Sequence, residues 1–576
     1  MSVPPTEQQE AKREASREDY ASSASSGARS SRRRRSSRRR HRSRSLSSRL
    51  RRQFEKLSVQ MSSGLRQVPF WGALLLLILL PLAMGGGELW ALPVSLAWCL
   101  CLYLCWGLSA LGASRQVPQL RVHWLCALPL GIIVAGAIQC WPNARLVEGL
   151  SPGALGHWRR LDAIGLTDVV PSLSIAPDLT RRYCLYALVV LLLMVLLISY
   201  CRSHFHVVFT ALAIALAVVV QALVAYYPFF SGKALFYWQA DIEPDILFGA
   251  FLNRNHFGFM LGMGALLMLG LIFAAMHSRQ RVLAKSSNRA HKRFMMMIIP
   301  LVVAWFFVQV SQVFSLSRGA FMGTVPVALV LVCVWLFRPH GYMRSRQRGS
   351  RQNLLMAAGV VLCALIIALP EALPRLSERY ERLVNDQIVT KDTRFVLWRE
   401  SLPMLRDYWL SGIGMGNYAQ VMTQYESDYT PMSLPNNAHN DWLELMLEVG
   451  VPTALALYAL FALFLLLSFR RLRRQEDSIL RWIGFGAFAA LVMGMIHELV
   501  DYSLRAPANG LIYATLMVLV LACSRSYPRR PSSSRRRSEL EGAAVAVPWS
   551  QRAILLLAAC LSLLALPAVH RRVVGS

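Results

Sequence analysis

"NRNHFGFMLGMGALLMLGLIFAAM", residues 253–276, opens with four polar residues and continues as an almost wholly apolar run. About 20 apolar residues in a helix are enough to cross the roughly 30 Å hydrocarbon core of a bilayer. The chain holds many such runs, because 55% of its 576 residues are hydrophobic and only 16% are charged. The sequence therefore predicts an all-α polytopic membrane protein.

The apolar runs predict thirteen transmembrane helices, at residues 70–86, 89–111, 122–141, 182–200, 205–229, 256–276, 294–314, 319–337, 353–370, 441–468, 481–501, 508–523 and 551–569. They divide the chain into four regions: an Arg/Ser-rich tail (1–66), N-terminal transmembrane helices (67–250), a central membrane region with a long outer loop at 371–440 (251–523), and a basic linker with a final helix (524–576).

The formal charge of +30 gives the chain a predicted sidedness. Thirteen Arg lie between Arg29 and Arg52, in a tail with too few apolar residues to form a core, so we expect this tail to be disordered. Basic stretches also fill alternate gaps between the predicted spans, at 113–121, 277–293, 338–352, 470–474 and 524–537. Because Lys and Arg are retained in the cytoplasm, the tail is predicted to be cytoplasmic. The gaps 142–181, 230–255 and 371–440 then face outward.

The basic tail has two alternative interpretations. It stops just before the first apolar segment and interleaves no aromatic side chains to stack on bases. We therefore expect it to anchor the topology and contact anionic membrane lipids, and we expect no nucleic-acid partner. Its length and polarity also disfavour a cleavable signal peptide.

Two clusters with an arginine are predicted at the outer face. Asn253, Arg254, Asn255 and His256 open the sixth span. Capping by Asn and snorkelling of Arg would account for part of this cluster, but an outer arginine runs against the positive-inside preference. In "SLSRGAF" (315–321), Arg318 begins a helix whose free N–H groups favour an anion. Two guanidinium groups on one face predict a clamp for a diphosphate.

A third cluster precedes the tenth predicted span and contains Asn437, His439, Asn440 and Asp441. Helix capping by Asn440 or Asp441 is the simpler interpretation. A neutral imidazole, however, accepts a proton from a hydroxyl when a neighbouring group orients its ring. We therefore predict that His439 is a general base.

A fourth cluster lies in "HELVDYSLRAPAN" (497–509). His497 and Asp501 are one helical turn apart in the eleventh predicted span, which places both on one side near the membrane boundary. Ionisable groups at that depth are candidates for function. Arg505 and Pro507 have the alternative role of shaping the connection between two helices.

The third cluster also carries a family motif. His439 and Asn440 are followed by the nine residues "DWLELMLEV", then Gly450, two residues and Thr453. This pattern resembles the signature of the O-antigen ligase and O-antigen polymerase superfamily of bacterial membrane transferases. "NRNHF", "SRGAF", "GIGMGNY" (412–418) and "VDYSLRAPAN" are also similar to family segments, so the resemblance covers roughly residues 250 to 520.

The resemblance implies a GT-C-like fold and an active site at the periplasmic face of the bacterial inner membrane. A glycan would pass from undecaprenyl diphosphate to a hydroxyl of a glycan or lipid-linked acceptor, with inversion and without a metal or other cofactor. His439 would be the base and Arg254 and Arg318 would hold the diphosphate. The remaining substrate-binding candidates are Asn253, Asn255, His256, Asn437, Asn440, Asp441, His497 and Asp501.

Other functions remain open from the sequence. A polysaccharide polymerase would use the same donor and the same clusters, and a protein O-glycosyltransferase would change the acceptor. A metal-dependent transferase would use Asp241, Glu243 and Asp245, whose carboxylates suit Mg²⁺ or Mn²⁺. A transporter or flippase for a polyanionic lipid would place its charges near the bilayer midplane. The eleven cysteines have no metal-binding spacing, and whether Cys140 and Cys184 pair is left open.

Overall fold

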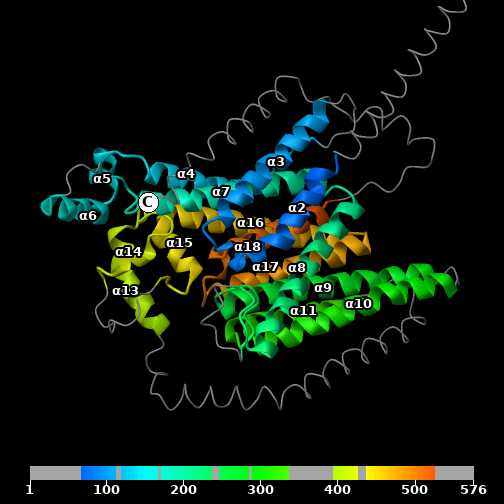
Figure 1. Cartoon of the computed structure of the whole chain (residues 1–576). Coiled ribbons are helices and arrows are strands. Elements are labelled where there is room, and N and C mark those ends of the chain that lie inside the picture. The colour runs from blue at the N-terminus through cyan, green and yellow to red at the C-terminus, as the bar shows by residue number, and fades with distance from the viewer. Residues whose placement is uncertain are drawn as a thin grey trace, which may run out of the picture. The chain divides into compact units, whose positions relative to one another are not determined.

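The computed structural model describes residues 66–111, 119–165, 170–236, 246–283, 288–336, 393–425 and 436–525. The chain divides into two units, residues 1–67 with 108–114 and residues 68–107 with 115–576. The second unit contains all the helices discussed below except the end of α3 (Figure 1).

The described residues form helices and connecting loops, without a strand among them. The apolar helices are α2 (Val68–Leu79), α3 (Ala91–Leu111), α4 (Ala127–Gln139), α7 (Pro177–Tyr200), α8 (His204–Ser231), α9 (Arg254–Leu283), α10 (Asn288–Phe314), α11 (Arg318–Leu336), α16 (Val451–Arg474), α17 (Ser478–His497) and α18 (Pro507–Cys523). The shorter helices are η1 (Leu80–Leu82), η2 (Met84–Gly86), η3 (Trp124–Cys126), α5 (Ala144–Leu150), α6 (Pro152–Ala163), α13 (Thr393–Asp407), α14 (Tyr418–Met422), α15 (Asp441–Val449) and η6 (Ser503–Arg505).

Seven of the described helices have the length and composition to cross a membrane, or eight if the bent pair Trp124–Gln139 and Ala144–Leu150 is one span. Three shorter apolar helices, Val68–Leu82, Ile298–Phe314 and Pro507–Cys523, add to them. The prediction of an all-α polytopic membrane protein is confirmed. The predicted spans 353–370 and 551–569, the tail 1–65 and the acidic stretch 241–245 lie outside the described residues.

The predicted span 441–468 is wrong as a single helix. The chain turns at Gly450, where φ is 84° and ψ is 149°, so α15 ends before α16 begins. A methyl group at Gly450 would lie 2.3 Å from the carbonyl oxygen of Leu410, so only glycine allows the two backbones to approach this closely. The carbonyl groups at the end of α15 instead accept hydrogen bonds from the loop 412–418, earlier in the chain, where the N–H of Ile413 donates to the carbonyl oxygen of Leu447. Of α15 and α16, only α16 is long enough to span the membrane.

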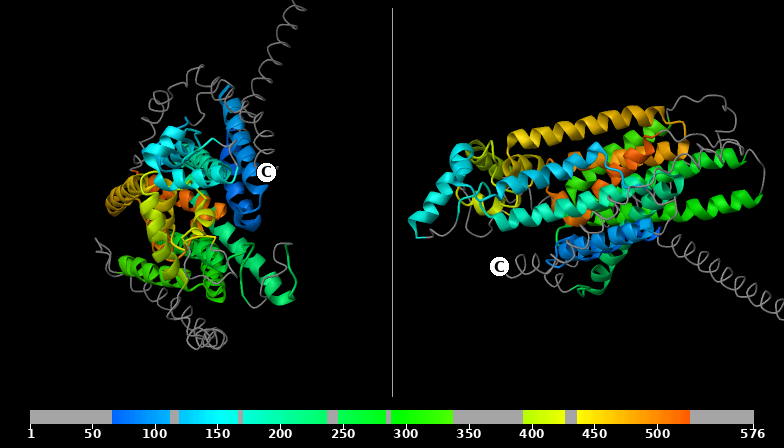
Figure 2. Two further views of the ribbon diagram at one scale, coloured as in Figure 1. Left: turned by 90° about the vertical axis from the view of Figure 1, so that its left-hand side faces the viewer. Right: turned by 90° about the horizontal axis from the view of Figure 1, so that it is seen from above.

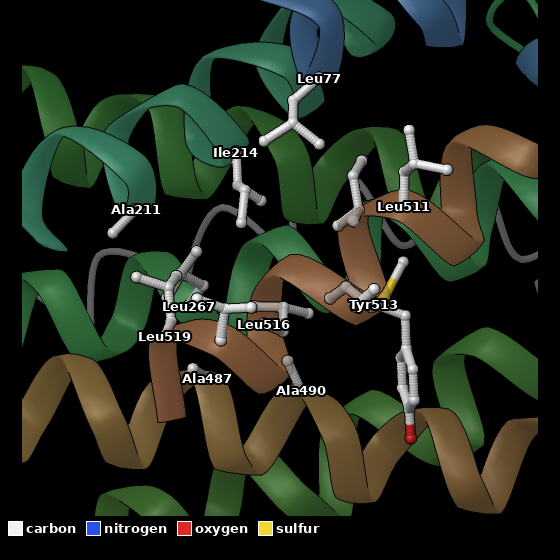
Figure 3. Close-up of a cluster of buried hydrophobic side chains, with 14 of the residues drawn as sticks. Leu77, Ala211, Ile214, Leu267, Ala487, Ala490, Leu511, Tyr513, Leu516 and Leu519 are labelled. Carbon is white, nitrogen blue, oxygen red and sulfur yellow. The ribbon is translucent and has the colours of Figure 1, made fainter. Parts of the chain in front are cut away.

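The centre of the bundle is α9. In its apolar segment 89% of residues are buried, against 22% in α11, whose exposed apolar side chains are left to face lipid. α9 packs tightly on α17, because Gly270 and Gly486 let the backbones meet: a methyl group on Gly270 would be 2.8 Å from the Cα atom of Gly486. Side chains of α2, α8, α17 and α18 fill the surrounding core (Figure 3).

One end of the bundle carries a cluster of short helices (Figures 1 and 2). The gap 142–181 contains α5 and α6, and α13 and α14 lie in the segment before His439. They share their own hydrophobic core, which includes Trp158, Met404, Tyr418, Ala438 and Leu447. Since Ala438 belongs to this core, the residues next to His439 are anchored to the short helices.

The nine cysteines in the described part of the chain are free thiols. The sulfur of Cys140 donates to the carbonyl oxygen of Pro177, and that of Cys184 is directed to the carbonyl oxygen of Ile133. Cys140 and Cys184 therefore do not pair in this structure.

Candidate active site

The loop between α17 and α18 is the hub of the site, because it touches the other three polar clusters. The Tyr502 hydroxyl accepts a hydrogen bond from Nδ2 of Asn253 at 3.4 Å. The Tyr502 ring also packs edge-on against two imidazoles, with centroid distances of 4.8 Å to His256 and 4.8 Å to His439. Segments about 250 residues apart in sequence therefore meet at one tyrosine.

The polar start of α9 combines capping with contacts to this loop. The side-chain oxygen of Asn253 accepts from the N–H of Asn255 at 2.8 Å, as the capping interpretation predicts. Nδ2 of Asn509 reaches the carbonyl oxygen of His256 at 3.1 Å. Arg254, the first residue of α9, is partly buried.

His439 lies beside a buried carboxylate. Its Nδ1 is 4.0 Å from Oδ1 of Asp501, whose side chain is 2% exposed, whereas the imidazole is 33% exposed. His439 adopts a φ of 49°, a conformation that residues other than glycine rarely take. The arrangement places Nδ1 toward Asp501.

Asp501 has an unusual electrostatic environment. Burial raises its pKa to about 6, although the hydrogen bond from the N–H of Tyr502 and the positive charge of Arg394 oppose this shift. The side chain of Asn255 adds a hydrogen bond that also favours the charged form. Asp501 therefore becomes a carboxylate only near neutral pH.

The prediction that His497 and Asp501 share a helix side is wrong. α17 ends at His497, and the N–H of Val500 turns back to the carbonyl oxygen of His497, so Asp501 belongs to the loop. His497 is fully buried, and neither of its ring nitrogens has a hydrogen-bond partner among the described residues. Its ring packs on Phe259, and a methyl group at Gly319 would lie 3.3 Å from it. His497 thus fills the junction of α9, α11 and α17.

Arg318 is the first residue of α11, next to Gly319. A methyl group at Gly319 would lie 3.6 Å from the side chain of Val500, so the start of α11 adjoins the hub loop. The Arg318 side chain is exposed. The helix start is held by Ser317, whose hydroxyl accepts from the N–H of Ala320 at 3.4 Å.

A buried ion cluster joins α15, the helix that follows His439, to Arg505 of the hub loop. The guanidinium of Arg505 binds Glu448 through two parallel hydrogen bonds of 2.9 Å and donates from Nε to Asp441 at 2.8 Å. Oε1 of Glu444 is 3.2 Å from the same Nε. Asn437 donates to Glu444 at 2.8 Å. Asn437 and Asp441, predicted to bind substrate, therefore have structural partners.

Asn440 caps α15, because its side-chain oxygen accepts from the N–H of Leu443 at 3.1 Å. Sequence reasoning did not single out Tyr502, Glu444 or Glu448. The carboxylates had a usable signal: acids at 441, 444 and 448 recur on one face of a helix that ends beside a membrane span. Buried carboxylates on one helix face need a positive charge near them, and Arg505 provides it.

An apolar cavity of about 280 Å³ lies between α4, α7, α15, α16 and α18. Its walls include Ile132, Met194, Leu457 and Phe461, and the side chains of Asp441, Glu498 and Arg505 border it. Since Arg505 is already matched by carboxylates, this cavity suits a hydrocarbon chain better than a diphosphate.

These features define a multi-pass, all-helical membrane protein with a histidine–carboxylate pair where four separate polar segments converge. Residues 302–458 match the family model of the O-antigen ligase domain, a segment that contains Arg318 and His439. The match confirms, for residues 302–458, the resemblance inferred from the His439 motif. The matched domain supports membrane glycan processing of the ligase or polymerase type, and the family implies lipid-linked glycans as substrates. No curated protein matches the chain in a sequence search.

Proposed function

We propose that this protein transfers a glycan from undecaprenyl diphosphate to a hydroxyl group of an acceptor sugar at the periplasmic face of the inner membrane. The observation that supports the proposal most directly is the approach of His439 to Asp501, with Nδ1 and Oδ1 4.0 Å apart. The histidine comes from the family-matched segment and the aspartate from a loop outside it.

In the proposed reaction, the acceptor hydroxyl oxygen attacks the anomeric carbon of the donor sugar. The bond from that carbon to the diphosphate oxygen breaks, and undecaprenyl diphosphate leaves with the bonding electrons. Nε2 of His439 takes the hydroxyl proton, and ionised Asp501 stabilises the imidazolium that forms. Attack opposite the leaving group gives inversion.

The leaving diphosphate needs positive charge near it as the bond breaks. Arg254 and Arg318 are the first residues of α9 and α11, so each guanidinium is paired with the N-terminal end of a long helix. Free N–H groups and the helix dipole favour an anion at such ends. Both helix starts adjoin the hub loop, through Asn253 and Gly319 respectively. We assign the diphosphate to this region.

By the family resemblance, the proposal extends to a reaction without a metal ion, which excess EDTA would then leave unchanged. The acceptor distinguishes a ligase from a polymerase. Deleting the gene tests the acceptor: loss of glycan from a surface lipid supports a ligase, whereas accumulation of single repeat units on the carrier supports a polymerase.

The His439→Ala variant tests the proposed base. We expect glycan transfer to fall by about 10² to 10⁴-fold, as for loss of a general base, while binding of undecaprenyl diphosphate persists. Membranes that carry lipid-linked glycan from the host cell provide the donor. Normal transfer by the variant would show that His439 is not the base.

A further inference from the structure

The backbone at His439 is held in a conformation that it would not adopt alone. A φ of 49° brings the Cβ atom of an L-residue close to its own backbone, and such residues persist only where neighbouring contacts fix them. The direction of the imidazole depends on this backbone. The contacts on both sides of His439 therefore decide where the ring points.

The peptide before His439 is fixed chiefly by Glu444. Oε2 of this carboxylate accepts from the N–H of Ala438 at 2.7 Å, and Oε1 accepts from Nδ2 of Asn437 at 2.8 Å. On the other face of the same segment, the indole N–H of Trp398 donates to the carbonyl oxygen of Ala438 at 2.9 Å. Ala438 is thus held through both its N–H and its carbonyl group.

The peptide after His439 is fixed by the start of α15 and by the hub loop. Asn440 caps the helix, and the N–H of Asp441 lies 3.1 Å from each of two carbonyl oxygens, those of Glu498 and Asp501. The second contact ties the His439 segment to the residue whose carboxylate faces its ring. Of these contacts, only those of Glu444 depend on a buried carboxyl group.

Burial raises the pKa of this carboxyl group to about 8, and the positive charge of Arg505 opposes the rise. Glu444 has no exposed surface, and Nε of Arg505 is 3.2 Å from its Oε1. The guanidinium is itself oriented by its two-pronged contact with Glu448, which also accepts from the N–H of Gly416 at 2.7 Å. Because a guanidinium fork fixes its partners in angle as well as distance, the cluster joins α15 rigidly to the 412–418 loop and to η6.

We propose that Glu444 and Arg505 are positioning residues for catalysis, which hold the strained His439 backbone so that its imidazole lies between Asp501 and the acceptor hydroxyl. The inference rests on the proposed role of His439 as base. Neither residue is assigned to touch substrate. Their effect is confined to the step that uses the base, and donor binding at Arg254 and Arg318 is left alone.

The test is Glu444→Gln in the full-length protein, in vesicles containing lipid-linked glycan from the host cell. Gln keeps the shape but turns one acceptor oxygen into a donor, which then faces the N–H of Ala438 or the donors of Asn437 and Arg505. We expect kcat to fall by about 10- to 100-fold, the scale of a displacement of about 1 Å at a reacting group. KM and the affinity for undecaprenyl diphosphate should stay within about twofold of wild type.

Asp477→Asn is the matched control. It makes the same charge-to-amide change at a partly buried acid that caps the opposite end of α17. Its kcat should equal that of wild type. Trp398→Phe is a second, uncharged variant, which removes the donor to Ala438 and keeps an aromatic ring of smaller size at this position. It should lower kcat several-fold with unchanged KM, and it keeps the test available if Glu444→Gln does not insert into the membrane.

Two results would overturn the inference. One is a wild-type kcat in both Glu444→Gln and Trp398→Phe while His439→Ala is inactive. His439 would then still be the base, but the contacts of Glu444 and Trp398 would not position it. The other is a parallel loss of kcat, undecaprenyl diphosphate affinity and thermal stability, which makes Glu444 merely structural. Normal activity of His439→Ala would instead reject the proposed function itself.

Discussion

Replacement of Asp501 by Asn isolates the electrostatic part of the proposed base. Two unit charges 4.0 Å apart attract by about 4 kcal/mol at an effective dielectric constant of about 20, which corresponds to roughly three orders of magnitude in rate. His439 is 33% exposed, so solvent screens part of this attraction. We therefore expect kcat to fall by about 10- to 100-fold. The N–H of Tyr502 keeps its acceptor, because the amide oxygen of Asn replaces the carboxylate oxygen.

The pH dependence gives this prediction a second signature. Burial raises the pKa of Asp501 to about 6, from an ordinary value of about 3.9. The carboxylate of Asp501 and the neutral imidazole of His439 are the active forms, so wild-type activity should fall as pH drops through about 6. The variant keeps only the protonation of His439, so its activity should fall less steeply with decreasing pH. Stability changes in the opposite sense. The native state binds the proton more tightly than the unfolded state, so the contribution of Asp501 is present below about pH 4 and is lost as pH rises through about 6.

The assay is initial glycan transfer in vesicles between pH 5 and 8, together with thermal unfolding in detergent over the same range. Asn cannot ionise, so the variant should be at least as stable as wild type above pH 6. Asp477→Asn, at the far end of α17, should retain the wild-type profile. An Asp501→Asn protein with the wild-type rate, or with an acid limb as steep as that of wild type at a reduced rate, would refute the reasoning.

Two further perturbations follow from the structure. Arg254→Lys and Arg318→Lys should each lower transfer by roughly 10- to 100-fold, because an ammonium keeps the charge but loses the two-pronged contact worth about 1.5–3 kcal/mol. Arg181→Lys, on an exposed ion pair, is the control. Full activity in both Arg254→Lys and Arg318→Lys would show that these arginines do not hold the diphosphate through such contacts. Gly450→Ala should destabilise the protein by at least about 3 kcal/mol in detergent unfolding, because a methyl group would lie 2.3 Å from the carbonyl oxygen of Leu410. The control is Gly149→Ala, whose methyl group meets no atom within 4 Å, so its stability should equal that of wild type. Equal stability of the two variants would contradict the account of the break between α15 and α16.

Hydrophobic runs predicted the described apolar helices except for the break within 441–468, since a bilayer imposes length and apolarity directly on the sequence. The break at Gly450 could not be predicted in this way. The run 441–468 reads as one helix, and what divides it is a contact with Leu410, which no local pattern contains. Glycine in an apolar helix is also common, so the residue alone carries no warning.

The residues of the candidate site could be predicted from the sequence in part, but not their partners. Polar residues at span ends identified His439 and Asp501, because charge at that depth is costly and needs a reason. The partners of these residues were not visible. Arg505 and Glu448 are 57 residues apart, and an acid in a short helix usually faces solvent, so only the folded chain reveals the ion pair. Tyr502 gave no signal, because an aromatic residue at a membrane boundary is expected in any case.

The glycine contact between α9 and α17 limits how this protein can be recombined with its relatives. Each helix leads to a different half of the site, and the pair Gly270–Gly486 sets their spacing at backbone contact. A chimera that imports one of the two from a donor with bulkier residues there would separate Asn253 from Tyr502 without altering either. Chimeras made to change the specificity of this protein should therefore take α9 and α17 together from the same relative.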